Sequence, residues 1–484
     1  MNNSATIQPD VGVKIQEIFQ AQKAAFTKSP YPSFKARIKD LKALKRQLQK
    51  YQDVLAEAIS QDFDGRAVAE SKMVDVMGSV FEINHALSHL KGWMAPARRS
   101  TELLFISNSI QVKYQPKGVV GVIVPWNFPL YLALGPMVAA MAAGNRVMVK
   151  MSELSPQTTR ALKQILAQVF EESKIAVVGA ELTDPNLFTA LPFDHLIFTG
   201  SPNVGKTVMK TAAANLTPLT LELGGKSPAV VSRSASLHDA AKRLAHGKAF
   251  NAGQVCLSPD YAFVPKESLR EFVSHIKAEF QKLYPTTESN EGYTSIISGP
   301  HFERLQDNLK DAEAKGAELI ACGIQGKTRQ MPLHLVIAPT EEMRILKEEI
   351  FGPLLPILTY ETFTEVVDYI NSHPRPLALY SFGHDKKERD LLLKNTHSGG
   401  VTINDWGWHA MNHDAPFGGI GNSGMGSYHG IEGFQQLSHG KTIFKKHRFF
   451  PVGLFYPPYT TWVQKFAINF FLGKADPNAK LNDD

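Results

Sequence analysis

The order of apolar and polar positions divides the chain into a helical N-terminal part and a longer part in which two periods alternate. Residues 34–60 place apolar side chains at helical spacing among Lys, Arg and Gln, so residues 11–97 are expected to form helices. Residues 103–114 differ, because two short β-prone runs flank Ser107-Asn108-Ser109. This pattern predicts a β-hairpin.

Short apolar runs alternate with helical patterns from Gly118 onward. Strands are expected at residues 119–124, 146–150, 175–178, 195–199 and 219–223, with helices between them at 130–143, 156–170, 185–190 and 204–214. This alternation is typical of a parallel, doubly wound sheet, which binds ligands at the carboxyl ends of its strands. Lys150, Gly200, Glu222 and the segment Pro125-Trp126-Asn127-Phe128-Pro129 fall at such ends.

A second alternating set follows the double glycine Gly224-Gly225. Its expected strands lie at residues 229–231, 261–264, 318–321, 335–337, 354–359, 377–382 and 401–403, with helices such as 269–283 and 302–314 between them. The pattern therefore predicts two α/β domains, and we find no internal repeat or low-complexity tract in the sequence.

The composition limits the classes of protein to consider. Hydrophobic residues make up 43% of the 484 residues and charged residues 20%, which is ordinary for a globular protein of two or three domains. The formal net charge of +6 forms no long basic block, so nucleic-acid binding is not favoured. Two cysteines cannot form a disulfide framework, and residues 1–10 show no basic stretch followed by an apolar run. We therefore expect a cytoplasmic protein.

The C-terminal tail permits two interpretations. Residues 445–448 are basic, and residues 449–456 and 462–472 are rich in aromatic and aliphatic side chains, with polar breaks at Gln464, Lys465 and Asn469. A membrane span needs about 20 consecutive apolar residues, so these breaks argue against one. The tail is expected to pack on its own subunit or on a neighbouring one. The alternative is an interfacial amphipathic anchor that gives weak membrane association.

The candidate chemistry centres on Cys256, one of the two cysteines. It follows Asn251-Ala252-Gly253-Gln254-Val255, whereas a cysteine in a structural core usually has apolar neighbours. A thiolate adds readily to an aldehyde carbon, and the adduct can release hydride to leave a thioester that water cleaves. The buried, inert thiol that is the common fate of a lone cysteine describes Cys322 better, at the end of an expected strand.

Two further side chains would complete a catalytic set with this thiol. Glu222 is a charged residue in an otherwise apolar strand, and in a cleft its pKa would rise so that it serves as a general base; a structural salt bridge is the alternative. Asn127 lies in a loop that two prolines stiffen, so its amide can bind a developing oxyanion together with the backbone N–H of Cys256. The alternative for Asn127 is to cap the helix expected near Leu130.

The signals for a nucleotide cofactor are weak one by one. No Gly-x-Gly-x-x-Gly follows the first strand of the alternating region, but residues 198–205 link a strand to a helix and carry Gly200 and Gly205. Pro202 suits the first position of that helix, whose N-terminus would favour a pyrophosphate.

Charged residues near two other strands suit the riboses of a dinucleotide. Lys150 and Glu153 can bind adenosine ribose hydroxyls, and Glu153 would repel a 2′-phosphate, which favours NAD over NADP; a surface ion pair is the alternative. One carboxylate of Glu348-Glu349 can hold the nicotinamide ribose while Phe351 packs against it, the alternative being an acidic helix end and a turn. The 16 histidines show no metal-ligand spacing with a second shell, so no metal is expected.

Taken together, these segments resemble the aldehyde dehydrogenase superfamily. The matching pieces occur in the family's order and cover most of the chain, at residues 125–129, 150–153, 198–205, 221–225, 253–256, 349–353 and 416–419. Residues 213–218, 375–380 and 399–405 support the match. The N-terminal region and the aromatic tail resemble the class 3 group, which handles fatty and aromatic aldehydes, and within it the bacterial coniferyl-aldehyde dehydrogenases.

The resemblance implies the fold class and the organisation of the chain. An α/β fold is expected, with a doubly wound, parallel-sheet NAD-binding domain at residues 1–100 and 115–223 and an α/β catalytic domain at residues 224–403. A β bridging or oligomerisation element would comprise residues 101–114 and 404–448, followed by a C-terminal tail at residues 449–484. The bridging element, made from the hairpin and a strand after Gly426, implies a homodimer.

The resemblance also implies roles for single residues. Cys256 would be the nucleophile, Glu222 the general base and Asn127 the oxyanion donor. The residues implied to contact NAD are Lys150, Glu153, Gly200, Ser201, Gly205, Glu349 and Phe351. Pro202 stands where the family often has Thr, which changes the helix start without blocking the cofactor.

The expected function is the NAD-dependent oxidation of an aldehyde to the carboxylic acid through a cysteine thioester. The aldehyde would be aromatic, such as coniferyl aldehyde, or long-chain, because Trp406, Trp408 and the aromatic tail suit either. An acylating dehydrogenase that passes the acyl group to coenzyme A is one alternative, and a non-catalytic structural paralogue is another. An acylating dehydrogenase needs no activated water, so the presence of Glu222 argues against it. A non-catalytic paralogue could lose Cys256 or Glu222 without penalty, so the presence of both residues argues against that alternative.

Overall fold

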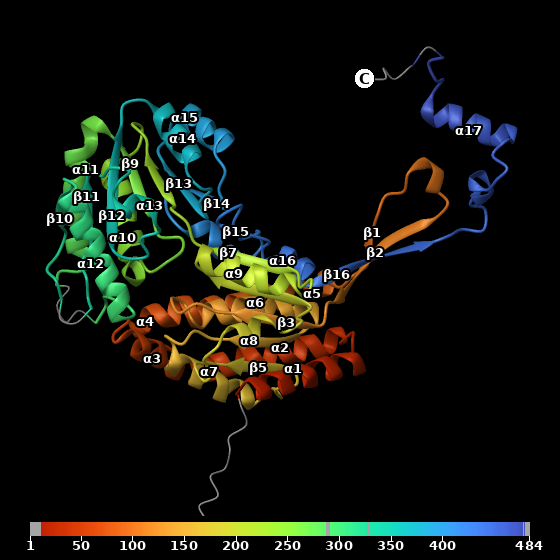
Figure 1. The fold of residues 1–484 in the computed structure, drawn as a ribbon, viewed down its shortest axis with the longest axis horizontal. Coiled ribbons are helices and arrows are strands. Elements are labelled where there is room, and N and C mark those ends of the chain that lie inside the picture. The colour runs from red at the N-terminus through yellow and green to blue at the C-terminus, as the bar shows by residue number, and fades with distance from the viewer. Residues whose placement is uncertain (1–10, 287–290, 327–328, 478, 480–484) are drawn as a thin grey trace, which may run out of the picture. The chain divides into compact units, whose positions relative to one another are not determined.

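The protein is represented by a computed structural model, which describes residues 11–286, 291–326, 329–477 and 479 (Figure 1). The chain divides into two compact units, one formed by residues 1–94 and 115–439 and the other by residues 95–114 and 440–484. The first unit contains both of the predicted α/β sheets, and the second contains a small sheet and the C-terminal tail.

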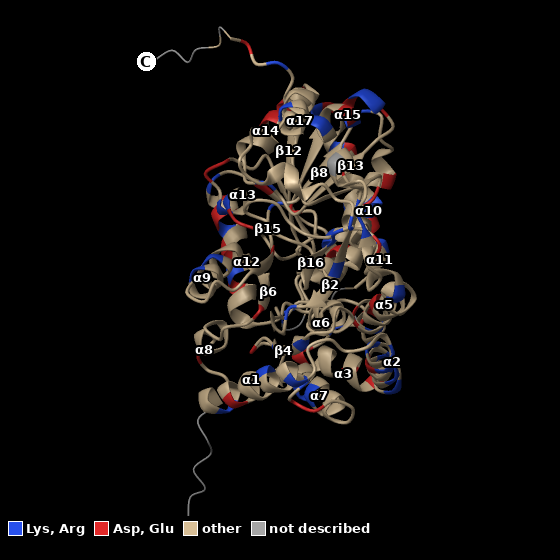
Figure 2. Cartoon of the chain, turned by 90° about the vertical axis from the view of Figure 1, so that its right-hand side faces the viewer, with Lys and Arg blue, Asp and Glu red and all other residues tan. Residues whose placement is uncertain are grey.

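Helices form the N-terminal part of the first unit, as the sequence predicts. They are α1 (Val11–Lys28), α2 (Phe34–Lys50), α3 (Gln52–Phe63), α4 (Val68–Ser71), the π-helical turn η1 (Lys72–Met77) and α5 (Gly78–Trp93). Helix α2 illustrates the cause, because Arg37, Leu41, Leu44 and Leu48 recur at helical spacing and are buried. Lys, Arg, Asp and Glu lie on such outer helices, with both signs on α2 (Figure 2).

The first sheet has six strands in the order β15-β7-β6-β3-β4-β5. These strands are β3 (Val119–Ile123), β4 (Arg146–Lys150), β5 (Ile175–Val178), β6 (His195–Gly200), β7 (Leu219–Leu223) and β15 (Gly424–Met425). Strands β3 to β7 pair in parallel, and β15 pairs antiparallel with β7. The connecting helices are α6 (Tyr131–Ala143), α7 (Pro156–Ala167), α8 (Asn186–Thr189) and α9 (Pro202–Ala213). The predicted doubly wound sheet is confirmed, and its order reverses between β3 and β6, where such sheets bind ligands.

Helix α6 lies in the interior of the first unit. Its sequence is apolar on every side, and each residue from Leu132 to Ala143 is buried, as expected for a helix enclosed by protein. The helix ends at Gly144, which adopts a left-handed φ of 92° and closes the last turn with its N–H. A Cβ atom at Gly144 would lie 2.7 Å from Cζ of Arg37, so a side chain there would displace the buried guanidinium as well as strain the backbone.

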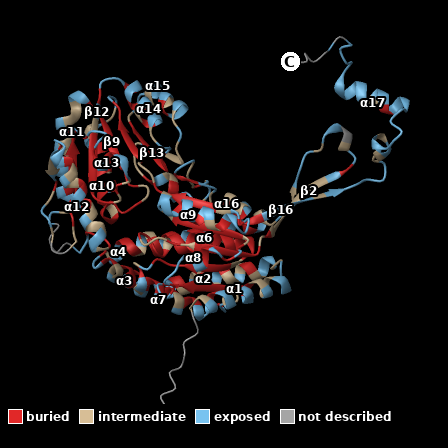
Figure 3. Ribbon diagram, in the orientation of Figure 1, coloured by how far each residue is buried: buried red, intermediate tan, exposed pale blue. Residues whose placement is uncertain are grey.

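The second sheet has seven strands in the order β10-β11-β12-β9-β8-β13-β14. They are β8 (Pro228–Val231), β9 (Tyr261–Pro265), β10 (Glu318–Ala321), β11 (His334–Ile337), β12 (Leu354–Tyr360), β13 (Ala378–Phe382) and β14 (Gly400–Ile403), so each predicted strand of the second set is confirmed. Only β10 departs from the parallel arrangement, by pairing antiparallel with β11. Buried residues concentrate in the strands of both sheets (Figure 3).

Short and long helices connect the strands of the second sheet and complete the first unit. They are α10 (Leu237–Ala249), η3 (Phe250–Gly253), η4 (Lys266–Ser268), α11 (Leu269–Leu283), α12 (Gly299–Ala314), α13 (Arg344–Lys347), α14 (Phe363–Ser372), α15 (Lys386–Asn395), η5 (Trp408–Met411) and α16 (Gly430–Gln436). The predicted helices 269–283 and 302–314 are thereby confirmed.

The second unit corrects the hairpin prediction. Its sheet has the order β1-β2-β16, with β1 (Ala97–Arg98), β2 (Ser109–Pro116) and β16 (Ser438–Lys445), and its helices are η2 (Leu103–Phe105), η6 (Val452–Phe455) and α17 (Trp462–Leu472). The predicted arm at residues 103–106 is not a strand, and Ala97 pairs with Val112 instead. The cause is Asn108, whose amide donates to the oxygen of Phe105 while its own oxygen accepts from the N–H of His447.

Little of the second unit is enclosed. Among its described residues, only Asn108 and Gln464 are buried, and both are polar. Apolar side chains of α17 therefore remain on the surface, such as Trp462 with 76% exposure and Phe466 with 64%. Within the part of the chain that the structure describes, no helix combines the length and apolar character needed to cross a membrane.

Candidate active site

Cys256 follows a backbone segment in an unusual conformation. Asn251, Ala252 and Gly253 have φ values of 47°, 50° and 71°, a left-handed run that costs about 1–2 kcal/mol at each non-glycine residue. Hydrogen bonds hold it in place, because the amide of Gln254 donates to the oxygens of Asn251 and Ser295 at 3.0 and 3.1 Å. The segment presents Cys256 as a half-buried free thiol.

Asn127 meets this cysteine-bearing segment directly. Its side-chain amide donates to the backbone oxygen of Gln254 at 3.2 Å, and its own backbone oxygen accepts from the amide of Asn251 at 3.1 Å. The alternative role as a helix cap is not supported, because the N–H groups of Leu130 and Tyr131 at the start of α6 donate to Asp75. Asn127 is 2% exposed, so the amide is held beside the cysteine segment in one place.

A buried ion pair that was not predicted from the sequence fixes the loop of Asn127. Arg66 donates to the oxygen of Asn127 at 3.2 Å and lies 3.3 Å from a carboxylate oxygen of Asp75. The other oxygen of Asp75 accepts from the N–H groups of Leu130 and Tyr131 at 3.2 and 3.1 Å. Asp75 interrupts an apolar run at residues 73–77, which is the same kind of signal that identified Glu222.

Glu222 lies in β7, opposite Thr199 of β6 and Gly424 of β15. The side chain is 3% exposed, and its Oε1 atom lacks a hydrogen-bond partner. Burial raises the pKa of Glu222 well above its ordinary value, as the sequence predicts. Among the described residues Glu222 forms no ion pair, so the salt-bridge alternative is not supported. A buried carboxyl with a raised pKa is suited to take up a proton during a reaction.

The surroundings of Cys256 keep its thiol protonated at rest. Removal from water raises the pKa of Cys256, and the negative charges of Glu349 and Glu222 raise it further, while backbone N–H groups of Cys256 and Leu257 lower it. Burial is the largest of these effects, so exclusion of water is the main cause of the raised pKa of Cys256. Cys322 behaves as the sequence predicts, since it is fully buried and burial raises its pKa to about 12.

Glu349 is the carboxylate of its pair that enters the site. A Cβ atom at Gly224 would lie 2.0 Å from Oε2 of Glu349, so the glycine lets this carboxyl approach the end of β7. Burial, followed by the charge of Asp260, raises the pKa of Glu349 to about 8. Lys226 stabilises the loop of Glu349 by donating a hydrogen bond to the backbone oxygen of Glu348 at 3.1 Å.

Phe351 joins this loop to the loop of Asn127. It has a left-handed φ of 49°, and its ring stands edge-on to Trp126 with the centroids 5.3 Å apart. Trp126 also packs edge-on against His301 at 5.0 Å. The predicted cofactor residue Phe351 and the predicted catalytic loop are therefore in contact.

The strand-to-helix segment at residues 198–205 forms as the sequence predicts. Ser201 caps α9 by accepting from the N–H of Val204 at 3.4 Å, and Pro202 is the first helical residue. A Cβ atom at Gly205 would lie 2.7 Å from a methyl carbon of Leu223, so glycine is needed for α9 to pack on β7. Gly200 ends β6 directly before this helix.

Lys150 and Glu153 form an ion pair at the end of β4. Their charged atoms lie 3.6 Å apart, with the Lys150 side chain 7% exposed and that of Glu153 66% exposed. The pair is therefore anchored by a buried lysine and is not a wholly surface feature. This pair and the glycine–serine turn before α9 lie at the carboxyl edge of the same parallel sheet. Together they fit a dinucleotide, which has a pyrophosphate and two riboses.

One cluster of ionisable groups lies outside the predicted site. His85 and His89 of α5 and Asp414 of the loop after η5 offer ligand atoms within 4.8 Å of one another. This grouping was not predicted from the sequence, because Asp414 is brought to the helix only by the fold. The absence of a metal stays a prediction.

Comparison with known proteins identifies the family. Residues 3–443 match the Aldehyde dehydrogenase family. The chain therefore belongs to the aldehyde dehydrogenase family, a class of oxidoreductases, and its two parallel sheets are those of the family fold.

Individual relatives show which members of the family this chain is similar to. The chain is 48% identical to a probable coniferyl aldehyde dehydrogenase of Pseudomonas aeruginosa, with 95% of this chain and 96% of that protein covered. It is 46% identical to a coniferyl aldehyde dehydrogenase of a Pseudomonas species, with 81% and 82% covered. A solved substrate-bound state of Staphylococcus aureus AldH superposes with a TM-score of 0.90 at 32% identity, covering 94% of this chain and 99% of that one. An indole-3-acetaldehyde dehydrogenase in complex with NAD+ is 25% identical, with a TM-score of 0.82 and coverage of 90% and 89%.

Proposed function

We propose that this protein oxidises an aldehyde to the carboxylic acid with NAD, using Cys256 as nucleophile, Glu222 as general base and Asn127 as oxyanion donor. The main support is the hydrogen bond between the Asn127 amide and the loop of Cys256. The charge of Glu222 also raises the pKa of the Cys256 thiol. Related solved structures hold NAD+, which supports this cofactor. NADP is the less favoured choice because of Glu153.

The residues divide the reaction into two steps. In its thiolate form, the sulfur of Cys256 bonds to the carbonyl carbon, and the oxygen that becomes negative is met by the Asn127 amide and the backbone N–H of Cys256. Bound NAD would supply the hydride acceptor that turns this adduct into a thioester. Glu222 then takes a proton from water as the C–O bond forms and the C–S bond breaks, which yields the acid, restores the thiolate and leaves the proton on Glu222.

The residues proposed to hold NAD lie at the carboxyl ends of β4 and β6 and in the loop between α13 and β12. Lys150 and Glu153 would bind the adenosine ribose, and Glu349 and Phe351 the nicotinamide ribose. Gly200, Ser201 and Gly205 would let the pyrophosphate reach the N-terminus of α9. The same carboxyl of Glu349 that approaches Gly224 also raises the pKa of Cys256, so cofactor binding and thiol activation are coupled.

Coniferyl aldehyde or a similar phenylpropenal is the proposed substrate. One relative is described as a coniferyl aldehyde dehydrogenase and another as a probable one. Phe128 stacks on Phe250 with ring centroids 6.1 Å apart, and Trp406 lies 5.7 Å from Phe250, so aromatic rings follow both Asn127 and the helix before Cys256. Such a wall favours a flat conjugated ring over a flexible alkyl chain.

Absorbance of NADH tests this proposal. The purified protein with NAD should reduce the cofactor with coniferyl aldehyde at a higher kcat/KM than with a long-chain aldehyde, and Cys256→Ala should abolish turnover while binding NAD. Cys322→Ala is the matched control and should keep full activity. If coenzyme A were required for turnover, the acylating alternative would hold instead.

We also propose a homodimer built through the second unit. Strand β16 ends the sheet β1-β2-β16 and is exposed along most of its length, so its free edge can pair with another copy. The exposed Phe444 of this strand adds apolar surface. Light scattering of the full chain, compared with a Phe444→Glu variant, tests the assembly.

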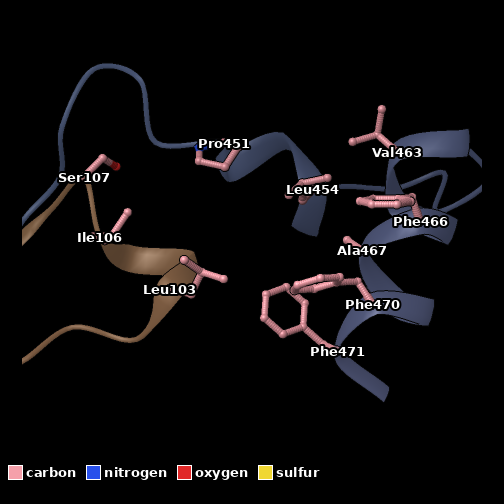
Figure 4. Close-up of a pocket in the computed structure, with 10 residues that line it drawn as sticks. All are labelled: Leu103, Ile106, Ser107, Pro451, Leu454, Val463, Phe466, Ala467, Phe470 and Phe471. Carbon is pink, nitrogen blue, oxygen red and sulfur yellow. The ribbon is translucent and has the colours of Figure 1, made fainter. Parts of the chain in front are cut away.

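Weak membrane association through the tail is proposed as a second property, for a protein that works in the cytoplasm. Leu103, Ile106, Val463, Phe466 and Phe470 line an apolar hollow between η2 and α17 (Figure 4). Basic residues at 445, 446 and 448 precede it in the sequence. Sedimentation with anionic vesicles should capture the wild type, and Phe466→Glu should stay in solution.

A further inference from the structure

Two histidines of α5 and one aspartate from far along the chain meet at the surface of the first unit. His85 and His89 are about one helical turn apart, so their rings lie on the same face of α5, with centroids 4.2 Å apart. The carboxylate of Asp414 lies 3.6 Å from Nε2 of His85. Each residue offers one ligand atom within 4.8 Å of the other two. Two histidines at this spacing on a helix can bind one transition metal ion.

The hydrogen bonds of the histidines leave the right nitrogen atoms free. Nδ1 of His89 lies 2.9 Å from the backbone oxygen of His85. A carbonyl oxygen can only accept, so Nδ1 carries the proton and Nε2 of His89 keeps its lone pair. Nε2 of His85 is a buried atom without a hydrogen-bond partner among the described residues. A backbone carbonyl that holds the second ring nitrogen is the arrangement that orients metal-binding histidines.

The neighbours of these ligands restrict their movement. The ring of Trp93 lies 5.6 Å from that of His85 and stacks on that of His89 at 5.9 Å. The ring of His413, 6.5 Å from that of His85, forms an ion pair with the buried Glu82. Nε2 of His413 is a second buried nitrogen without a partner among the described residues. Buried polar atoms in this state need an explanation, and a bound ion is one of the few available.

The chemistry of the ligand atoms selects the kind of metal. Two imidazole nitrogens and one carboxylate oxygen suit zinc, which such atoms hold at about 2.0–2.2 Å. Mg²⁺ and Ca²⁺ prefer oxygen ligands and would leave both rings unused. Two ligand atoms on one tetrahedral zinc ion are about 3.4 Å apart, close to the 3.6 Å between His85 and Asp414. The Asp414 side chain is 71% exposed, so water can take the fourth position.

We propose that His85, His89 and Asp414 bind one Zn²⁺ ion at the surface of the first unit. None of the three belongs to the residues proposed for catalysis or for NAD, so the site goes beyond the proposed function. The sequence predicts that no metal binds, and the proposal departs from that prediction because the third ligand reaches α5 only in the folded chain.

A zinc ion at this site would tie α5 to the loop that leads to Phe417. Asp414 lies three residues before Phe417, whose ring belongs to the apolar cluster that packs against Cys256. The ion would therefore restrict the motion of residues 412–417, next to the proposed nucleophile. Its contribution is structural, since it contacts neither the aldehyde nor the thiol.

Calorimetric titration with Zn²⁺ tests the site directly. The full chain, without a polyhistidine tag and freed of metal with EDTA, should bind one Zn²⁺ ion in the absence of substrate and NAD. His89→Ala and Asp414→Asn should each weaken this binding by at least tenfold, since even the loss of a group that only orients a ligand costs about 10–100-fold. Both side chains are exposed, so these variants should fold. His384→Ala, on an exposed loop, is the matched control and should bind like the wild type.

The thiol of Cys256 is the main competitor for the ion, because a thiolate is also a zinc ligand. Cys256→Ala should keep the binding of one Zn²⁺ ion if the surface site holds it. A wild type that binds no Zn²⁺, a Cys256→Ala variant that has lost the binding, or unchanged binding in both His89→Ala and Asp414→Asn would overturn the zinc site. Absence of NADH from the wild type with every aldehyde would instead overturn the proposed function, and the titration would be unaffected.

Cobalt absorption and hydrogen exchange locate the ion. In the Cys256→Ala background, Asp414→Cys supplies a thiolate ligand, so bound Co²⁺ should give a sulfur-to-cobalt charge-transfer band. His384→Cys in the same background should give none. Zn²⁺ should also slow hydrogen exchange of the amides at residues 412–417 in the wild type, and should leave it unchanged in Asp414→Asn. Bound Co²⁺ without the band in Asp414→Cys would place the ion elsewhere and overturn the proposal.

Discussion

The side-chain amide of Asn127 donates to the backbone oxygen of Gln254 at 3.2 Å, which joins the loop after β3 to the loop of Cys256. Asn251 donates to the same oxygen at 3.1 Å, so two amides converge on one acceptor. The donor proposed for the oxyanion is thus in place before any substrate arrives. Preorganisation of this kind avoids the cost of orienting a dipole during the reaction.

Replacement of Asn127 tests this donor. Asn127→Ala should lower kcat by about 10²–10³, since one oxyanion donor contributes that much in comparable sites. The dissociation constant for NAD should stay the same, because the side chain is aimed at the loop of Cys256. Steady-state kinetics and a fluorescence titration with NAD measure the two quantities. A loss of NAD affinity with an unchanged kcat would contradict the assignment.

The pH dependence of turnover tests Glu222. A general base must be ionised, so activity should fall as the pH drops through the raised pKa of Glu222. This acid limb should lie above the ordinary glutamate value of about 4.3. Glu222→Gln should lose the limb and reduce the steady state by about 10²–10⁴ while the first turnover of NADH persists. An acid limb near the ordinary carboxyl value would count against the buried base.

The Arg66–Asp75 pair should affect stability and rate in different ways. Arg66 also pairs with the buried Glu70 at 3.2 Å, so Asp75→Asn removes one of its two carboxylate partners and should cost about 1–3 kcal/mol. The triple variant Arg66→Met, Glu70→Leu and Asp75→Leu should recover much of that stability, because it removes all three charges. Its kcat should still be reduced, since the N–H groups of Leu130 and Tyr131 lose their acceptor and the loop of Asn127 is released. Urea unfolding and kinetics on both variants measure this; a triple variant with normal kcat would refute the positioning role.

Charge removal at Glu153 tests the cofactor preference. Glu153→Gln should raise the ratio of kcat/KM for NADP over NAD by roughly tenfold, about 1.4 kcal/mol, because repulsion of the 2′-phosphate is relieved. The effect should shrink at high salt, since the Glu153 side chain is 66% exposed. Glu313→Gln, on α12, is the control and should leave the ratio unchanged. An unaltered ratio in Glu153→Gln would mean that Glu153 does not face the phosphate.

Much of the fold was readable because its strands are short, continuous apolar runs bounded by turn residues. Strands β3 to β9 and β11 to β14 follow that rule, and the structure has them near the expected residues. The prediction of a strand at residues 103–106 was wrong because a distant contact decides the conformation of this segment. Asn108 binds the N–H of His447, and no local pattern reveals a partner so far along the chain.

Residues of the candidate site could be predicted from the sequence only where one polar residue interrupts an apolar or glycine-rich segment. Cys256, Glu222 and Asn127 give that signal by themselves. Arg66, whose role depends on Asp75 and on the oxygen of Asn127, gives none. The same holds for His413, which becomes notable only when the fold brings it to Glu82.

Lys248 provides a last test, of the electrostatics beneath the active site. The side chain is fully buried, and its Nζ atom has no hydrogen-bond partner among the described residues. Burial lowers the pKa of Lys248 from 10.5 to about 8, although Asp260 acts in the opposite direction. Because the folded pKa is the lower one, stability associated with this group is present above pH 10.5 and is lost as the pH falls through about 8. Glu349, with its pKa near 8, is protonated over the same acid range and cannot compensate the charge.

Lys248→Met should therefore stabilise the fold at pH 7 by roughly 1–3 kcal/mol, since methionine fills a similar volume and carries no charge. The gain should decrease between pH 8 and pH 10, where the lysine of the wild type is already neutral. Urea unfolding at pH 7 and pH 9.5 measures the difference, with Lys282→Met as a control because that side chain is 71% exposed. A variant that is less stable than the wild type at pH 7 would mean that the ammonium group is held by an ionised Glu349 or Asp260, so that the lysine supports the loop next to Cys256.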